Sequence, residues 1–250
     1  MRMNLWLVLF CRLNVRYKGS WISTVFWSAF GMFMAGFFAG YGAFFRQFRE
    51  QFETTGAIAP SSPFLAAAMT RFLASRKAGS APVRVLEIGP GTGPVTDSIV
   101  RLLRAGDVFD LLELNGEFVR ILQHRFEADP AWSAVVSQCR IQQLPIQQFV
   151  AESPYDFVIS GLPLNNFPAA LVREITDAYF RLLKTGGVLS YFEYMYVRPM
   201  RKLVTFGADR RRIVEIDKIM AEQCQRSRIC RDSVWINLPP AWVQHLRNGG

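Results

Sequence analysis

Two glutamates on either side of a glycine-rich turn are the residues whose types and spacing could do chemistry in this chain. Glu87 is followed by Gly89, Gly91 and Gly93 at alternate positions. Glu113 comes about twenty residues after the last of these glycines. Glycine lets the backbone of a turn approach a ligand closely, because no Cβ stands in the way. A carboxylate on each side of the turn favours a ligand that carries positive charge and hydroxyl groups, since a carboxylate attracts cations and accepts hydrogen bonds.

Two classes of ligand use a glycine turn at the start of a helix. A dinucleotide requires G-x-G-x-x-G, with its pyrophosphate on the helix N-terminus. Here the third glycine comes one residue early, and Pro94 stands where that motif has glycine. Glu87 would also repel a pyrophosphate, whereas S-adenosylmethionine has no phosphate and carries an ammonium and a sulfonium. The pattern therefore predicts an S-adenosylmethionine site, with Glu113 accepting hydrogen bonds from the ribose hydroxyls. A glycine-rich turn in another kind of α/β protein is the alternative.

The elements that position these residues alternate between strand and helix along the chain. The predicted strands are 83–87, 110–113, either 135–136 or 140–141, 155–160, 188–196 and a closing pair within 234–243. The predicted helices start at Pro63 (capped by Ser62), at Pro94, at Gly116 and at Ala169. The one from Ala169 runs to Leu183 with Gly186 as its C-cap, and a last helix is capped by Asp209. This alternation predicts an α/β fold with a doubly wound, mainly parallel seven-stranded sheet. The ligand then lies at the C-terminal ends of the strands.

A second loop, at the end of the predicted strand 155–160, could hold the group that is modified. Methyl transfer from a sulfonium requires a neutral nucleophile, so an amine that arrives as ammonium must first lose its proton. In Ser160-Gly161-Leu162-Pro163 the proline fixes the backbone, so that loop carbonyls can accept hydrogen bonds from nitrogen. The loop resembles the N-P-P-Y and N-L-P-Y loops of amino methyltransferases, with Leu164 in place of the tyrosine. That replacement favours an aliphatic amine over a planar base. An ordinary strand-to-helix turn is the alternative.

The predicted strand 188–196 carries the candidate catalytic side chains. Alternation along a strand places Tyr191 and Glu193 on one face and Tyr194 on the other. A tyrosine ring could hold a methylated ammonium by cation–π attraction, and Glu193 or a phenol could take the proton. Core tyrosines with satisfied hydroxyls are the alternative.

Charge and cysteine content restrict the partners. The chain has 250 residues, a net charge of +9 and a sequence pI near 9.8, so a large partner is expected to be anionic: nucleic acid or an acidic membrane surface. Its four cysteines and two histidines show no metal-binding spacing, and we expect no metal site. The cysteines indicate free thiols in a reducing compartment.

An uncharged stretch, 21–45, precedes the glycine turn and has basic residues on both sides. As a helix it would extend about 37 Å, enough to cross a bilayer. Basic flanks fit a segment that lies on an anionic leaflet as well as one that spans it. A helix buried against the rest of the chain is the alternative, and translation from Met32 or Met34 would shorten the stretch.

The next stretch, 44–52, alternates phenylalanines with charged residues at helical spacing and predicts an amphipathic helix. We therefore expect two parts in the chain: an apolar membrane-associating segment over 1–45 and a catalytic domain over 46–250.

Several segments together resemble one family, the bacterial phospholipid N-methyltransferases of the class I S-adenosylmethionine-dependent superfamily. They are the helix at 44–52, T-G-A-I-A-P-S-S at Thr55–Ser62, L-E-I-G-P-G-T-G at Leu86–Gly93, S-G-L-P-L at Ser160–Leu164 and N-L-P-P-A at Asn237–Ala241. The resemblance covers roughly residues 44–247. Members of the family dock on the membrane and methylate the amine of phosphatidylethanolamine, and a similar branch methylates ornithine lipids. Glu193 departs from the glutamine or threonine usual there, and the apolar leader is not typical.

The resemblance implies a Rossmann-like class I methyltransferase fold, S-adenosylmethionine as the cofactor and an amine-bearing lipid at an anionic membrane as the partner. The residues expected to bind the cofactor are Glu87, Gly89, Pro90, Gly91, Thr92, Gly93, Glu113, Leu114, Gln143, Ser160 and Ser61. The residues expected at the reacting centre are Gly161, Leu162, Tyr191, Glu193 and Tyr194. The expected location is the cytoplasmic face of the inner membrane, peripheral or with a single span.

Two other interpretations remain at this point. An RNA adenine N6-dimethyltransferase shares the glycine loop, the Leu-Pro loop and the basic charge, but it fits less well with Leu164, with the apolar leader and with the lack of a C-terminal helical domain. A non-catalytic membrane-anchored protein on a decayed methyltransferase fold fits less well with intact Glu87 and Glu113. The headgroup, the number of methyl transfers and the oligomeric state stay open.

Overall fold

The computed structural model describes residues 62–195 and 207–249 of the chain. The predicted apolar segment 21–45, the amphipathic stretch 44–52 and Ser61 lie outside these residues. Within the described ranges, no helix is both long enough and apolar enough to cross a membrane.

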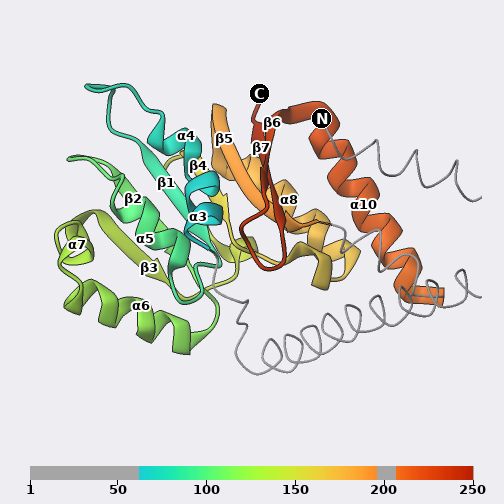
Figure 1. The fold of residues 1–250 in the computed structure, drawn as a ribbon, viewed down its shortest axis with the longest axis horizontal. Coiled ribbons are helices and arrows are strands. Elements are labelled where there is room, and N and C mark those ends of the chain that lie inside the picture. The colour runs from blue at the N-terminus through green and yellow to red at the C-terminus, as the bar shows by residue number, and fades with distance from the viewer. Residues whose placement is uncertain (1–61, 196–206, 250) are drawn as a thin grey trace, which may run out of the picture. The chain divides into compact units, whose positions relative to one another are not determined.

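Seven strands form one mixed sheet, in the order β3-β2-β1-β4-β5-β7-β6 (Figure 1). Their bounds are β1 Arg84–Ile88, β2 Val108–Leu112, β3 Cys139–Gln142, β4 Tyr155–Ser160, β5 Leu183–Tyr194, β6 Arg228–Val234 and β7 Ala241–Arg247. The first five strands are parallel, and β7 runs antiparallel between β5 and β6. The predicted mainly parallel seven-stranded sheet is confirmed. The strand order reverses between β1 and β4, the place where such sheets bind ligands.

Helices cover both faces of this sheet, as the doubly wound pattern predicted. The α-helices are α3 Pro63–Met69, α4 Arg71–Ala74, α5 Pro94–Val100, α6 Gly116–Ala128, α7 Pro130–Ser133, α8 Ala169–Leu182 and α10 Gly207–Ser227, and the 3-10 turns are η1 Val136–Gln138, η2 Ile146–Gln148 and η3 Leu164–Asn166. On one face, α8 and α10 pack on the sheet through Val172, Ile175 and Ile216. On the other, α3, α5, α6 and α7 do so through Leu65, Ile99, Leu122 and Trp132.

Local signals placed most helix starts correctly. Ser62 accepts a hydrogen bond from the Leu65 amide and so caps α3, with Pro63 in its first turn. Pro94 likewise stands in the first turn of α5, where its missing N–H costs nothing. Of the two alternatives for the third strand, the one at 140–141 is confirmed.

Three predicted boundaries are wrong. Gly186 is not the C-cap of α8, because that helix ends at Leu182 and β5 begins at Leu183. Gly186 instead donates its N–H to the Asn248 carbonyl (2.7 Å) within the strand pairing. Asp209 lies inside α10, which begins two residues earlier. The closing strand pair exists, but most of 234–243 forms the turn between β6 and β7, since two consecutive prolines cannot donate ladder hydrogen bonds.

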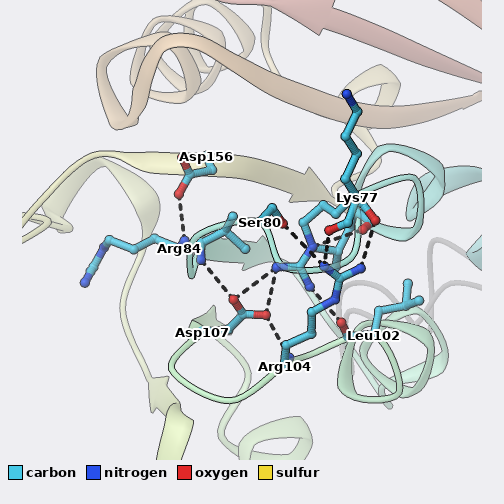
Figure 2. Close-up of polar contacts among 10 residues, drawn as sticks. Lys77, Ser80, Arg84, Leu102, Arg104, Asp107 and Asp156 are labelled. Atoms are coloured by element: carbon cyan, nitrogen blue, oxygen red, sulfur yellow. Dashed lines mark hydrogen bonds and ion pairs between the residues drawn. The ribbon is translucent and has the colours of Figure 1, made fainter.

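A buried ion pair stabilises the end of the sheet where β1 and β2 begin (Figure 2). Asp107 has 2% of its surface exposed and accepts two hydrogen bonds from Arg76, at 3.0 and 2.9 Å. Its oxygens also accept the amide protons of Val83 (2.9 Å) and Arg104 (2.8 Å), as Figure 2 shows for Arg104. One carboxylate therefore fixes the N-terminal ends of both strands, at the end of the sheet opposite the glycine turn.

Candidate active site

The glycine turn follows β1 directly and is folded back toward β2. Gly89 donates its N–H to the Leu112 carbonyl at the end of β2 (2.9 Å), and Gly93 donates to the Pro90 carbonyl (3.0 Å). The φ angles of Gly89, Gly91 and Gly93 are 68°, 58° and 89°, a region that side chains with a Cβ rarely adopt. A Cβ built on Gly91 would meet no atom of residues 62–195 or 207–249 within 4 Å. The middle of the turn therefore has an open side against which a ligand can lie.

The other side of the turn rests on α6 and α7. A Cβ on Gly93 would come within 2.7 Å of the Trp132 ring. Arg125 donates to the Gly93 carbonyl (3.2 Å) and its guanidinium lies 4.0 Å from the centre of the Trp132 ring. Asp97 accepts hydrogen bonds from both Trp132 and Arg125. Sequence reasoning missed this support, since no local pattern links Arg125 to a turn 32 residues away.

Glu87 is near the end of β1 and almost fully buried, with 1% of its surface exposed. One of its oxygens accepts a hydrogen bond from the Thr96 hydroxyl of α5 (2.7 Å). Burial raises the pKa of Glu87 to about 8, against the opposing effect of the Thr96 hydrogen bond, and the charge of Glu113 raises it further. The group is therefore largely protonated at neutral pH until a cation approaches. A bound cation would stabilise the carboxylate form.

Glu113 follows β2 and ties the glycine turn to the neighbouring strand. One oxygen accepts the Gly91 N–H (3.0 Å) and the other accepts the Asn115 N–H (2.9 Å). Burial raises the pKa of Glu113, and these backbone hydrogen bonds oppose that shift. Both glutamates predicted from the sequence thus lie at the C-terminal ends of adjacent parallel strands, on either side of the open turn.

The loop after β4 packs directly on the glycine turn. Gly161 donates to the Ile88 carbonyl (2.8 Å), and a Cβ on Gly161 would lie 2.5 Å from the Gly89 carbonyl oxygen. A Cβ on Gly89 would in turn lie 2.7 Å from the Leu162 side chain. The two predicted loops are therefore in contact, and glycine is required at both positions.

Ser160 holds this loop in place. Its hydroxyl is 2.5 Å from the Tyr179 hydroxyl of α8 and accepts the Leu162 N–H at 3.3 Å. Ser160 is 1% exposed, so its side chain faces the core beneath the loop. Tyr179 was not predicted as part of the site, because its helical spacing is typical of any core residue.

The three candidate side chains of β5 are distributed as alternation predicted. Tyr191 is 2% exposed and lies on the α8 and α10 face, with its hydroxyl 3.3 Å from Cys224 Sγ. Glu193 accepts a hydrogen bond from Gln244 on β7 (2.6 Å). Tyr194 packs on the opposite face, its ring edge-on to Phe192, and burial raises its pKa above the usual range.

The remaining candidate residues surround the same end of the sheet. Gln143 follows β3 and donates to the Leu114 carbonyl (3.3 Å), so the ends of β2 and β3 are linked there. Leu114 is 65% exposed. In the turn itself Pro90 is buried and Thr92 is exposed.

One group of side chains brings together residues that are distant in sequence. The ligand atoms of Cys230, Asp232 and His245 lie within 4.8 Å of one another, a spacing compatible with a metal ion. Arg71 lies in this group, 2.6 Å from Asp232 and 3.8 Å from Cys230 Sγ. His245 also contacts the Ser190 hydroxyl at 2.8 Å. The pairing of β6 with β7 creates this cluster, which spacing along the chain did not indicate.

The fold agrees with comparisons to known proteins. The methyltransferase domain family matches residues 85–187. Ornithine lipid N-methyltransferase from Singulisphaera acidiphila is 30% identical over 179 residues, which are 69% of this chain and 88% of that protein. Ribosomal RNA small subunit methyltransferase A from Parasynechococcus marenigrum is 32% identical over 108 residues, 40% of this chain and 34% of that protein.

Solved structures show the same fold at low identity. N-methyltransferase NodS from Bradyrhizobium japonicum WM9, in complex with S-adenosyl-l-homocysteine, superposes with a TM-score of 0.55 and 16% identity, covering 80% of this chain and 98% of that one. Glycopeptide N-methyltransferase MtfA, complexed with sinefungin, superposes with a TM-score of 0.57 and 14% identity, covering 78% and 89%.

Proposed function

The chain belongs to the lipid N-methyltransferase family of the class I S-adenosylmethionine-dependent methyltransferases, and on this premise we propose that it transfers methyl groups to the amine of a membrane lipid. The lipid is an ornithine lipid or phosphatidylethanolamine. The observation that carries the proposal is the match to ornithine lipid N-methyltransferase over 88% of that protein. The RNA methyltransferase, by contrast, is matched over 34% of its length.

S-adenosylmethionine is the cofactor, and the residues of the turn fit it. Glycines with positive φ and an open side at Gly91 leave space for it. Glu87, buried with one hydrogen-bond donor beside it, is suited to a cationic amino group, and Glu113 to ribose hydroxyls. When bound, S-adenosylmethionine supplies an electrophilic methyl group.

In the reaction, the protein's own residues keep the amine unprotonated and exclude water from it. The loop 160–163 is fixed by the Ser160 hydroxyl and by the Gly161 hydrogen bond to β1. Its carbonyls can accept hydrogen bonds from an amine that has lost its proton. Leu164 is 6% exposed and packs into the core beside α8. It therefore offers no ring on which a planar base could stack, and this supports an aliphatic amine.

A membrane location completes the proposal. The substrate is embedded in a bilayer, the net charge is +9, and the apolar stretch 21–45 has basic flanks. We place the enzyme on the cytoplasmic face of the inner membrane, where S-adenosylmethionine is present.

Radiolabelled S-adenosylmethionine tests the proposal. The protein is incubated separately with an ornithine lipid, with phosphatidylethanolamine and with ribosomal RNA, and the products are resolved by thin-layer chromatography or gel. Label in a lipid that disappears in Glu113→Ala supports the proposal, and Glu117→Ala, on the exposed surface of α6, is the matched control. Label in RNA with none in either lipid would replace the proposal by the RNA alternative.

A further inference from the structure

The turn between β6 and β7, residues 235–240, exposes three large apolar side chains. Trp235 is 57% exposed, Ile236 68% and Leu238 82%. No charged residue occurs from 233 to 243. Isolated exposed apolar residues are common, but three within four positions form a patch of the kind that marks an interaction surface.

The 235–240 turn is held in this arrangement by its polar residue. Asn237 is partly buried; its amide oxygen accepts the Ser62 N–H (3.0 Å) and its amide nitrogen donates to the Pro239 carbonyl (2.7 Å). The Pro240 carbonyl accepts the Met195 N–H (2.8 Å). The polar side chain thus points inward and the apolar ones outward. A turn that faced only water would be expected to have the opposite arrangement.

The 235–240 turn lies at the same end of the sheet as the active site, the end at which the parallel strands finish. Ser160, the last residue of β4, pairs in register with Tyr191 of β5. Strand β5 continues three residues further, to Tyr194, which pairs with Ala241 of β7. At about 3.3 Å per residue, the turn starts about 10 Å beyond the end of β4. Figure 1 shows the β6–β7 hairpin with its connecting turn near α3. A surface that meets this turn therefore also faces the opening of the site.

Positive charges also lie at this end of the sheet, at the start of α10. The contact that places the first residues of α10 there is the hydrogen bond from the Arg212 guanidinium to the Asn166 carbonyl, in the segment after β4 (3.3 Å). Arg210 and Arg211 are exposed in the first turn of α10. Phe64, 56% exposed, follows the Ser62 amide that binds the turn. Exposed aromatic and aliphatic side chains, with arginines at the same end of the sheet, match a bilayer with anionic headgroups, where tryptophan favours the interface.

We propose that the 235–240 turn inserts into a lipid bilayer through Trp235, Ile236 and Leu238, so that the end of the sheet that carries the active site faces the membrane. This inference rests on the proposed lipid substrate for its purpose, but insertion itself is measured without that substrate.

Vesicle co-sedimentation of the full chain tests the proposal. The vesicles contain phosphatidylcholine and phosphatidylglycerol, neither of which has a primary amine. Trp235→Ser and Leu238→Ser should each weaken binding about tenfold, equal to about 1.4 kcal/mol. Val150→Ser is the matched control, because Val150 is 87% exposed but comes just before β4, at the end of the sheet where the parallel strands begin. Its binding should equal that of the wild type.

The difference in fluorescence between the wild type and Trp235→Phe reports on the turn, because the other tryptophans are common to both proteins. Lipids brominated in the acyl chains should quench the wild type more than Trp235→Phe, which keeps an apolar ring and should still bind vesicles. Equal quenching in the two proteins, or equal vesicle affinity of both serine variants and the wild type, would overturn the proposal. Loss of self-association in the serine variants, with vesicle binding unchanged, would instead assign the turn to a second copy of the chain.

The outcomes also separate this proposal from the proposed function. Vesicle binding that depends on Trp235, with no methylation of any lipid, would retain insertion and reject the lipid substrate. Lipid methylation with binding that is insensitive to all turn variants would do the reverse.

Discussion

Cofactor binding should release a proton from Glu87, and this can be measured. Burial raises the pKa of this carboxyl to about 8, so in the cofactor-free protein it is mostly protonated at pH 7. The cationic cofactor favours the carboxylate, so binding at pH 7 should release close to one proton. Below pH 8 the dissociation constant should rise about tenfold for each unit by which the pH is lowered, because one pKa unit corresponds to about 1.4 kcal/mol.

Glu87→Gln and Thr96→Val test this reasoning. The amide that Glu87→Gln introduces does not titrate and can still accept from the Thr96 hydroxyl, so the variant should fold, bind weakly and lose the pH dependence between 6 and 8. Thr96→Val removes a hydrogen bond that lowers the pKa of Glu87, so the pH dependence should extend to higher pH. Isothermal titration calorimetry in two buffers of different ionisation enthalpy counts the protons. No proton release in the wild type, or the same pH dependence in Glu87→Gln, would refute the assignment.

The same shift sets the sign of a stability effect in the cofactor-free protein. Because the pKa of Glu87 is raised on folding, the folded chain keeps a proton that the unfolded chain releases above pH 4.5. The free energy of unfolding should therefore fall as pH rises from 4.5 to about 8 and level off above that. In Glu87→Gln this decrease should be absent, as urea titrations at several pH values would reveal.

Three further perturbations have defined outcomes. Asp107→Ala should destabilise the fold by about 3–5 kcal/mol in urea unfolding, because it leaves the buried Arg76 without its partner; exposed Asp177→Ala is the control, and a loss under about 1 kcal/mol would contradict the role given to the pair. Gly161→Ala should abolish cofactor binding in calorimetry, since its Cβ would lie 2.5 Å from the Gly89 carbonyl oxygen, whereas unchanged affinity would mean that the two loops can separate freely. Removal of residues 1–43 should reduce recovery with membranes more than turnover on detergent-solubilised lipid, and a variant that sediments like the full chain would exclude that segment from membrane binding.

The local order of residues was enough to predict the site's framework. A short apolar strand, glycines at alternate positions and a proline at the helix start specify a strand, a turn and a helix through backbone geometry alone. Glu87 and Glu113 could be placed near strand ends for the same reason. Alternation along 188–196 likewise assigned Tyr191 and Tyr194 to opposite faces.

Contacts between distant segments required the tertiary structure, because sheet order and not chain order decides which loops meet. The approach of Gly161 to Gly89 follows from β4 lying beside β1. The support of Gly93 by Arg125, and the contacts of Arg71 with Cys230 and Asp232, depend on helices that pack on the sheet. Packing also placed Tyr191 against Cys224 in the core, which a period of two residues cannot specify. The sequence determined the type of ligand that the turn accepts, and only the fold determined what holds that turn open.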